Sequence, residues 1–401
     1  MGLSNLKINL SKNVILVTLY VLVLFQFFKI FSLKYPYFIF LALLFLFTVV
    51  EIPKSLKFKR LIILMCLGIC VSFVSSLYFR NQPVVETFKA SIAFFSILFY
   101  FFLTNRKFSI LTIEKTILIL GILASCIYIL QTLLLPLGIR IIPVSEITEF
   151  GSSRFRIAGS GVISLVFFLA LNKVILGKSI LIHRIGLFLT GGTIVLMGFR
   201  TLLAGLILFS ILLFLRCGVT LKKSFKVVVI SFAIAAVLLC IPQVNDRLFY
   251  MVQKQQLSDQ TFVNADYARW REWDHFMHYH FKSNWEMLLG SGMPGGGTDY
   301  GKYDKNLQES WIFWVDWGLI GLSWMIGIFP VLCMIGYSLL AFVTKVPKSY
   351  LYAGVWFLFL VAISVTTMEF YRFGNFAVQA LALYLVVQVN KSYQLKLRCK
   401  S

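Results

Sequence analysis

The chain has 401 residues, of which 59% are hydrophobic and 13% are charged, and its mean hydropathy is +0.86. A water-soluble core cannot bury so large an apolar fraction, so a membrane protein is indicated. The net charge of +22 would also suit a nucleic-acid-binding protein, but the basic residues lie in short loops between apolar segments, so no nucleic-acid partner is expected.

About twelve segments are long and apolar enough to cross a bilayer, which needs roughly 20 apolar residues per helix. They cover 13–33, 35–52, 60–79, 84–103, 114–136, 158–176, 180–198, 201–217, 224–243, 310–342, 348–367 and 373–390. Backbone polar groups in lipid must pair within their own segment, so we predict an all-α polytopic membrane protein with a single integral membrane domain over 1–401. The first segment has no small-residue cleavage site and is expected to be a retained anchor.

Lysine and arginine clusters occupy every second loop between these segments. They lie at 54–60, 106–107, 222–226, 345–348 and 391–400. The only acidic residues on the side of the membrane that carries these clusters are Glu51 and Glu114. Basic loops stay in the cytoplasm, so both termini are predicted to be cytoplasmic. The remaining loops, including 138–160 and 244–309, are then predicted to lie outside.

Two of these outer loops are long and polar enough to form an active site. The first, 138–160, contains Glu146, Glu149, Arg154 and Arg156. In the second, 244–309, apolar residues recur at helical spacing at Val263, Tyr267, Trp270, Trp273, Met277 and Phe281. This spacing predicts a helix lying on the outer membrane interface. The glycine-rich stretch that follows, 289–301, is predicted to be either a flexible element near an acceptor or a plain linker.

Arginines on the outer side are candidates for holding a diphosphate without a metal, because a guanidinium keeps its charge and presents a planar fork to phosphate oxygens. They can also stabilise a diphosphate as a leaving group. The candidates are Arg154, Arg156, Arg200, Arg269, Arg271 and Arg372. Each has an alternative role, in which it reaches lipid headgroups or pairs with a loop acid. A functional role is favoured for Arg200, which stands in a very short turn between two apolar segments.

A glycosyl acceptor hydroxyl benefits from a general base, and a carboxylate or a histidine can serve. The outer acids are Glu146, Glu149, Asp266, Glu272, Asp274, Glu309 and Asp316. Glu309 is preferred because it follows the glycine-rich stretch at the start of a predicted span, although a helix-start acid would suit that place equally well. Of the nearby histidines, His275, His278 and His280, none fits an established zinc spacing, so no metal site is predicted and packing or proton shuttling is favoured.

Four stretches together resemble the O-antigen polymerase and O-antigen ligase superfamily, bacterial multi-pass glycosyltransferases with a GT-C helical architecture. Arg156-Ile-Ala-Gly159 resembles the family's Arg-x-x-Gly element, and Arg200 resembles the arginine that opens a later span. Arg269-x-x-x-Trp273 with Leu288-Leu-Gly-Ser-Gly292 is similar to the long-loop pattern, and Trp317-Gly-Leu-Ile-Gly321 to the element after it. Together they cover about residues 150 to 325.

The resemblance implies a polymerase that joins undecaprenyl-diphosphate-linked repeat units into O-antigen, capsule or exopolysaccharide on the outer face of the plasma (inner) membrane. It implies catalysis without a metal or cofactor, with Arg156, Arg200 and Arg269 gripping the diphosphate. The partners implied are the lipid-linked glycan donor and acceptor, membrane lipids and a chain-length regulator.

Two alternatives stay open at this stage. One is a ligase of the same superfamily. Ligases usually carry a histidine shortly before the Gly-Leu-Ile-Gly element, where this chain has Asn306, Gln308 and Glu309, so a polymerase is favoured; His280 could replace that histidine if the loop folds back. The other is a flippase or transporter of lipid-linked sugars, which the long outer loop and the near absence of charges in the span centres disfavour.

Overall fold

The computed structural model describes residues 13–15, 17–18, 57–137, 139, 145–149, 152–218 and 268–399. Within these ranges four helices are long and apolar enough to cross a membrane. They are Lys59–Arg80, Val84–Arg106, Ile110–Leu134 and Arg200–Cys217. The expectation of a helical protein with helices long and apolar enough to span a membrane is therefore confirmed. The expected spans 35–52 and 224–243, and nearly all of 13–33, lie outside the described residues.

The described chain before the long gap forms a run of helices interrupted by one hairpin. Its elements are α3 (Lys59–Arg80), α4 (Val84–Ser91), η3 (Ile92–Leu98), α5 (Phe99–Arg106), α6 (Ile110–Leu134), η4 (Leu135–Leu137), β1 (Ser145–Glu149), β2 (Ser152–Arg156), α7 (Gly161–Ile175), α8 (Leu181–Met197) and α9 (Arg200–Cys217). The helices match the expected spans closely, since a long apolar run has no other way to satisfy its backbone in lipid.

The second part is helical throughout, with shorter pieces. Its elements are α12 (Ala268–Asp274), the π-helical turn η5 (His275–His280), α13 (Asn284–Leu289), α14 (Asp299–Glu309), η6 (Trp314–Trp317), α15 (Gly318–Ile326), α16 (Ile328–Val343), η7 (Lys348–Tyr350), α17 (Leu351–Ile363) and α18 (Asn375–Arg398). The helix expected over 263–281 is thus α12 continued by η5, and its first residues lie outside the described chain.

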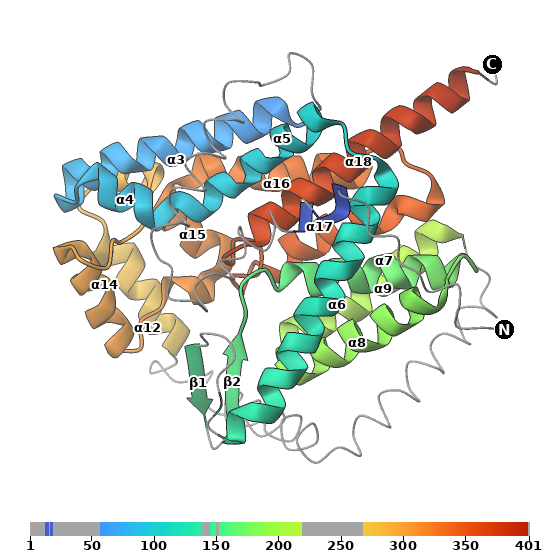
Figure 1. Ribbon diagram of the computed structural model, residues 1–401. Helices are drawn as coiled ribbons and strands as arrows, with labels where there is room; N and C mark the ends of the chain where they lie inside the picture. The colour runs from blue at the N-terminus through green and yellow to red at the C-terminus, as the bar shows by residue number, and fades with distance from the viewer. Residues whose placement is uncertain are drawn as a thin grey trace.

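The centre of the bundle is α18, which packs against α5, η3, α6, α7 and α17 (Figure 1). Every residue from Asn375 to Val387 is buried, because this helix is surrounded by other helices rather than by lipid. On one side α16 lies between α3 and α17. On the other, α7 packs against α6, α8 and α9.

One expectation about the elements was wrong, and one needs an addition. The described chain is helical as expected, but the loop after α6 also contains an antiparallel hairpin of β1 and β2, with Ser145 opposite Arg156 and Glu149 opposite Ser152. The span expected over 310–342 is broken into η6, α15 and α16. The breaks fall at Gly318 and Gly327, whose φ angles of 52° and 90° lie in a region that side chains other than glycine rarely adopt.

The predicted alternation of loops agrees with the contacts between described residues. Loops expected inside meet at one end of the bundle: Lys178 bonds Ser349, Arg216 donates to the carbonyl of Phe342, and Asn390 donates to that of Lys345. Loops expected outside meet at the other end, where Arg80 pairs with Glu286 and the amide of Gly159 donates to the carbonyl of Phe373. We call these the basic end and the loop end.

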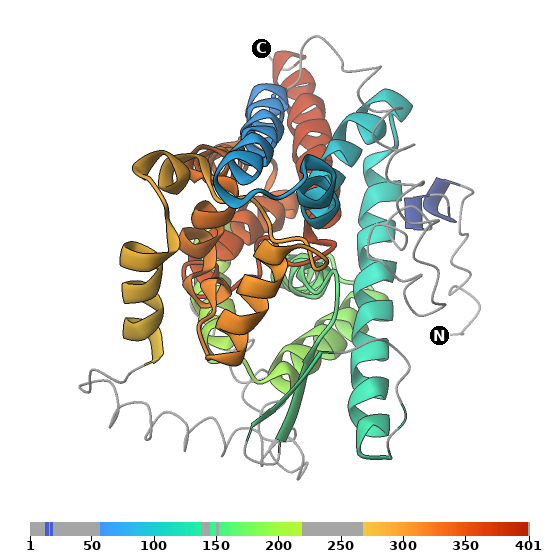
Figure 2. The ribbon, with the colours of Figure 1, turned by 90° about the vertical axis from the view of Figure 1, so that its left-hand side faces the viewer.

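The loop end carries α12 to α14 and the hairpin. These elements lie at the lower left in Figure 1, with the C-terminus at the upper right. Figure 2 shows the hairpin beside the C-terminal part of α6, α12 and α13 on the opposite side of the bundle, and α14 between them in this view. The two long outer loops of the sequence therefore belong to the same end of the molecule.

Candidate functional site

The segment 364–374, which joins α17 to α18, is where the motif-bearing elements of the loop end meet. We call it the α17–α18 connection. The amide of Leu319, in the Gly-Leu-Ile-Gly element, donates to the carbonyl of Ser364 at 2.7 Å. The ring of Trp314 stacks on that of Tyr371, with centroids 5.9 Å apart. The chain after the long loop is thus fixed to this connection at two points.

The Arg-x-x-Gly element also contacts this connection. The amide of Gly159 donates to the carbonyl of Phe373 at 2.6 Å, and that of Gly161 to Oδ1 of Asn375 at 2.9 Å. A Cβ on Gly161 would lie 2.9 Å from Cγ of Asn375, so only glycine permits this approach. Arg156, the last residue of β2, is therefore held three residues from the contact, although its side chain lies outside what the structure describes.

A buried ion pair within the connection stabilises this junction. Arg372 pairs with Oε1 of Glu369, and the two residues are 5% and 7% exposed. Ser160 donates its hydroxyl to Oε2 of Glu369 at 3.1 Å. The charge of Arg372 is therefore already balanced, so this arginine positions the connection rather than offering a free cation to a diphosphate.

Arg200 approaches the connection by way of α9. Gly205 packs so closely on α17 that a Cβ there would lie 2.5 Å from Cγ2 of Ile363, the last residue of that helix. Arg200 is the first residue of α9 and is exposed. Five residues of helix separate it from Gly205, a rise of about 7.5 Å. Since α9 begins where α17 ends, Arg200 lies at the loop end, on the side of the connection.

Arg269 and Arg271 belong to α12, which is docked on the chain before α15. Trp273 packs against Trp317 and Trp324, with centroid distances of 4.9 and 6.1 Å. Arg269 is half-buried and Arg271 is exposed. Trp273 is thus half-buried against α15 and η6, while Trp270 beside it is 51% exposed.

Glu272 is an acid of α12, between the two arginines and Trp273 in the sequence, and it contacts the chain just before η6. It is 1% exposed, and its Oε1 accepts a hydrogen bond from the amide of Phe313 at 3.2 Å. Burial and the charge of Asp316 raise the pKa of Glu272 to about 7, against the smaller effects of the Phe313 amide, Arg269 and a hydrogen bond from the Trp317 side chain. A carboxyl with such a pKa can accept or release a proton near neutral pH.

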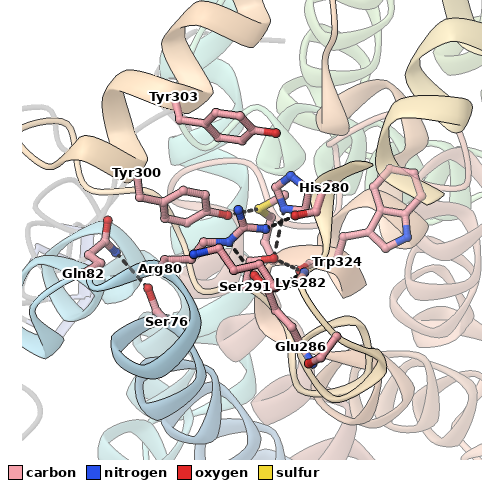
Figure 3. Close-up of polar contacts among 12 residues, drawn as sticks. Ser76, Arg80, Gln82, His280, Lys282, Glu286, Ser291, Tyr300, Tyr303 and Trp324 are labelled. Carbon is pink, nitrogen blue, oxygen red and sulfur yellow. Dashed lines mark hydrogen bonds and ion pairs between the residues drawn. The ribbon is translucent and has the colours of Figure 1, made fainter. Parts of the chain in front are cut away.

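A second polar cluster of the loop end, shown in Figure 3, surrounds Arg80 in the last turn of α3. Its guanidinium pairs with Glu286, donates to the carbonyl of His280, and lies over the ring of Tyr300, 5.0 Å from the centroid. Glu286 also accepts the amide of Lys282 at 2.7 Å. Arg80 therefore ties the long loop to a membrane-spanning helix, with its charge balanced by Glu286.

His280, one of the two expected bases, belongs to this cluster. It is 2% exposed, and its Nε2 is 3.0 Å from the hydroxyl of Ser291. Burial, with the charge of Arg80 as a smaller cause, lowers the pKa of His280 to about 2. A base this weak takes up almost no proton at neutral pH, so we assign His280 a packing role. His275 bonds the hydroxyl of Tyr303 at 2.9 Å, and His278 pairs with Asp274 at 3.0 Å.

Glu309, the other expected base, is the last residue of α14 and not a helix-start acid. Its side chain is 65% exposed and lies 3.7 Å from the amine of Lys305. It sits one residue before Ser310 and several before η6.

The first part of the glycine-rich stretch is a packed element and not a plain linker. The amides of Ser291 and Gly292 donate to the carbonyls of Trp324 and Met325 at 2.9 and 2.7 Å. The amide of Gly295 donates to Gln82 at 2.8 Å. The stretch therefore packs between α15 and the residues that precede α4. At its start, Gly290 packs against Gly327, the residue at which α15 ends.

Replacing Gly290 by alanine should therefore destabilise the protein. The φ of Gly290 is 87°, and a Cβ there would lie 2.3 Å from the amide nitrogen of Gly327. Backbone strain alone costs about 1–3 kcal/mol, and the overlap adds to it. Gly297→Ala is the matched control, since a Cβ at Gly297 meets nothing within 4 Å. Thermal unfolding of the purified variants in detergent measures the difference, and equal midpoints would contradict it.

Arg80, Glu286 and Glu272 were not singled out from the sequence. Arg80 ends an apolar span, where an arginine usually reaches toward headgroups. Glu286 follows Ser283 at the spacing of a helix capping box, and its amide does bond the Ser283 hydroxyl at 3.1 Å. Glu272 is one of several acids in a polar loop. Only the three-dimensional contacts distinguish these residues from their neighbours.

Comparisons of the chain with known protein families, with curated proteins and with solved structures found no match.

Proposed function

We propose that the protein is a glycosyltransferase of the bacterial plasma membrane that polymerises undecaprenyl-diphosphate-linked repeat units into surface polysaccharide. The observation that supports this most is the meeting of the Arg156, Arg200 and Arg269 elements around the α17–α18 connection, at the end opposite the basic loops. In this proposal the loop end faces outward, both termini are cytoplasmic, and the twelve spans form a GT-C arrangement.

The proposed reaction joins two lipid-linked glycans. The diphosphate of the donor is held by Arg156, Arg200 and Arg269, with Arg154 and Arg271 as further contacts. A hydroxyl of the acceptor forms a bond to the anomeric carbon of the donor, and the bond from that carbon to the diphosphate oxygen breaks. Undecaprenyl diphosphate leaves with the electron pair, and the arginines stabilise its growing charge. Orientation of the two glycans lowers the barrier further.

Deleting the gene in a strain whose surface polysaccharide runs as a ladder on a gel tests this function. A polymerase predicts that the ladder collapses to single repeat units that are still attached to their final acceptor. Loss of all attached glycan would instead indicate a ligase. Accumulation of repeat units on the cytoplasmic face would indicate a flippase. The gel shows whether attached glycan is present and how long it is. The lipid-linked intermediates, separated by membrane face, show where single repeat units accumulate.

A further inference from the structure

The carboxyl of Glu272 differs from the other buried glutamates that the structure describes. Glu286 is paired with Arg80 and accepts a second bond from Lys282. Glu369 is paired with Arg372 and accepts a second bond from Ser160. Each of these two acids has both oxygens occupied, as a buried structural carboxylate requires.

One of the two carboxyl oxygens of Glu272 accepts no hydrogen bond of normal geometry from the described residues. Oε1 accepts the Phe313 amide, but Oε2 is buried and has no hydrogen-bond partner among the described residues. The indole of Trp317 lies beside this carboxyl and lowers its pKa as a hydrogen-bond donor, although its buried Nε1–H makes no bond of normal geometry within the same part of the chain. A carboxylate oxygen that receives at most this weak bond keeps the capacity to accept the proton of a hydroxyl.

The charges around Glu272 fit a proton acceptor. Asp316 of η6 opposes the ionised form, whereas Arg269, one turn earlier on α12, and the indole of Trp317 favour it. Across the Trp314–Tyr371 stack, the charges of Glu369 and Arg372 balance each other. Burial outweighs Arg269, so the pKa of Glu272 lies above its ordinary value, at about 7. The carboxyl is then ionised above this pH and protonated below it.

We propose that Glu272 is the general base of the glycosyl transfer, which rests on the function proposed above. As the acceptor oxygen bonds to the anomeric carbon and the bond to the diphosphate breaks, the hydroxyl proton passes to Oε2 of Glu272. In this assignment Glu272 takes the role expected for Glu309 or His280. Arg269, a proposed diphosphate ligand, lies one helical turn before Glu272 on α12, so the base and the diphosphate site are neighbours.

The test compares Glu272→Gln with the wild-type protein, purified and reconstituted in lipid nanodiscs, on a lipid-linked oligosaccharide. We expect kcat to fall by about 10²–10⁴-fold, the usual contribution of a general base. The affinity for undecaprenyl diphosphate should stay unchanged. Asp299→Asn, an exposed acid of α14 paired with Lys302, is the matched control and should keep full activity.

The pH profile separates a base from a structural acid. Wild-type kcat should fall as the pH drops through about 7, because Glu272 becomes protonated. In Glu272→Asp, which retains a carboxyl and serves if the glutamine variant does not fold, this limb should move to another pH. Full activity in Glu272→Gln, loss only in Glu309→Gln, or an unmoved limb in Glu272→Asp would overturn the assignment. Wild-type protein that lengthens no glycan would instead refute the proposed function itself.

Discussion

Alanine in place of Arg156, Arg200 or Arg269 is expected to abolish long polysaccharide chains while the protein remains in the membrane. Each guanidinium would stabilise charge that grows on the diphosphate as it leaves, and loss of one such donor lowers kcat by about 10²–10³-fold. Lysine should rescue poorly, because a point charge does not reproduce a two-pronged contact with phosphate oxygens. The measurement is the polysaccharide ladder in cells, together with the rate of elongation by purified protein.

Arg184→Ala provides the matched control for these variants. Arg184 lies on α8 at the basic end, where its guanidinium bonds the hydroxyl of Ser179 at 3.5 Å. Removing it deletes the same charge from the same protein without touching the loop end. An unchanged ladder in all three loop-end variants would show that the diphosphate is not held there. Equal loss in Arg184→Ala would show that the effect comes from net charge alone.

Removing one partner of the Arg80–Glu286 pair should strongly destabilise the long loop. The side chains are 9% and 0% exposed, so either variant leaves a charge buried without compensation. Breaking a buried pair in this way typically costs about 3–5 kcal/mol. Arg80→Met and Glu286→Leu are expected to lower the free energy of unfolding by this amount, while the double variant should lose less than the sum. Unfolding in detergent, followed by tryptophan fluorescence, measures all three.

The control for this cycle is the exposed pair of Lys302 and Asp299 on α14, with side chains 71% and 96% exposed. Surface pairs of this kind contribute little, so Lys302→Met should leave the unfolding midpoint almost unchanged. If Arg80→Met were as stable as the wild-type protein, Arg80 would not be the residue that ties the loop to α3. Additive losses in the double variant would show that the two side chains act independently.

The long apolar helices could be predicted from the sequence because hydropathy and length decide them. α3, α8 and α9 begin and end within one residue of their expected bounds. The break of the span over 310–342 could not be predicted in the same way. Gly318 and Gly327 sit in an apolar stretch, and only their positive φ angles and the chain packed against them end the helices.

The candidate residues of the site could be predicted from the sequence, but the contacts between them could not. The arginines follow from their place on the outer side, and the structure brings Arg200 and Arg269 to the same end as the Arg156 element. That Arg372 is neutralised by Glu369 depends on a turn between α17 and α18 that hydropathy does not reveal. Burial likewise separates Glu272 from Glu309, since both are acids of one polar loop and only one is enclosed by η6 and α12.

Elongation by the purified protein tests the central claim most directly. The protein in nanodiscs is given one defined lipid-linked repeat unit in the presence of EDTA, and the products are resolved on a gel and by mass spectrometry. We predict glycans that grow by whole repeat units, with one undecaprenyl diphosphate released per unit added, and loss of this growth in Arg200→Ala and Arg269→Ala. Repeat units that stay single, with their lipid diphosphate still attached, would contradict it.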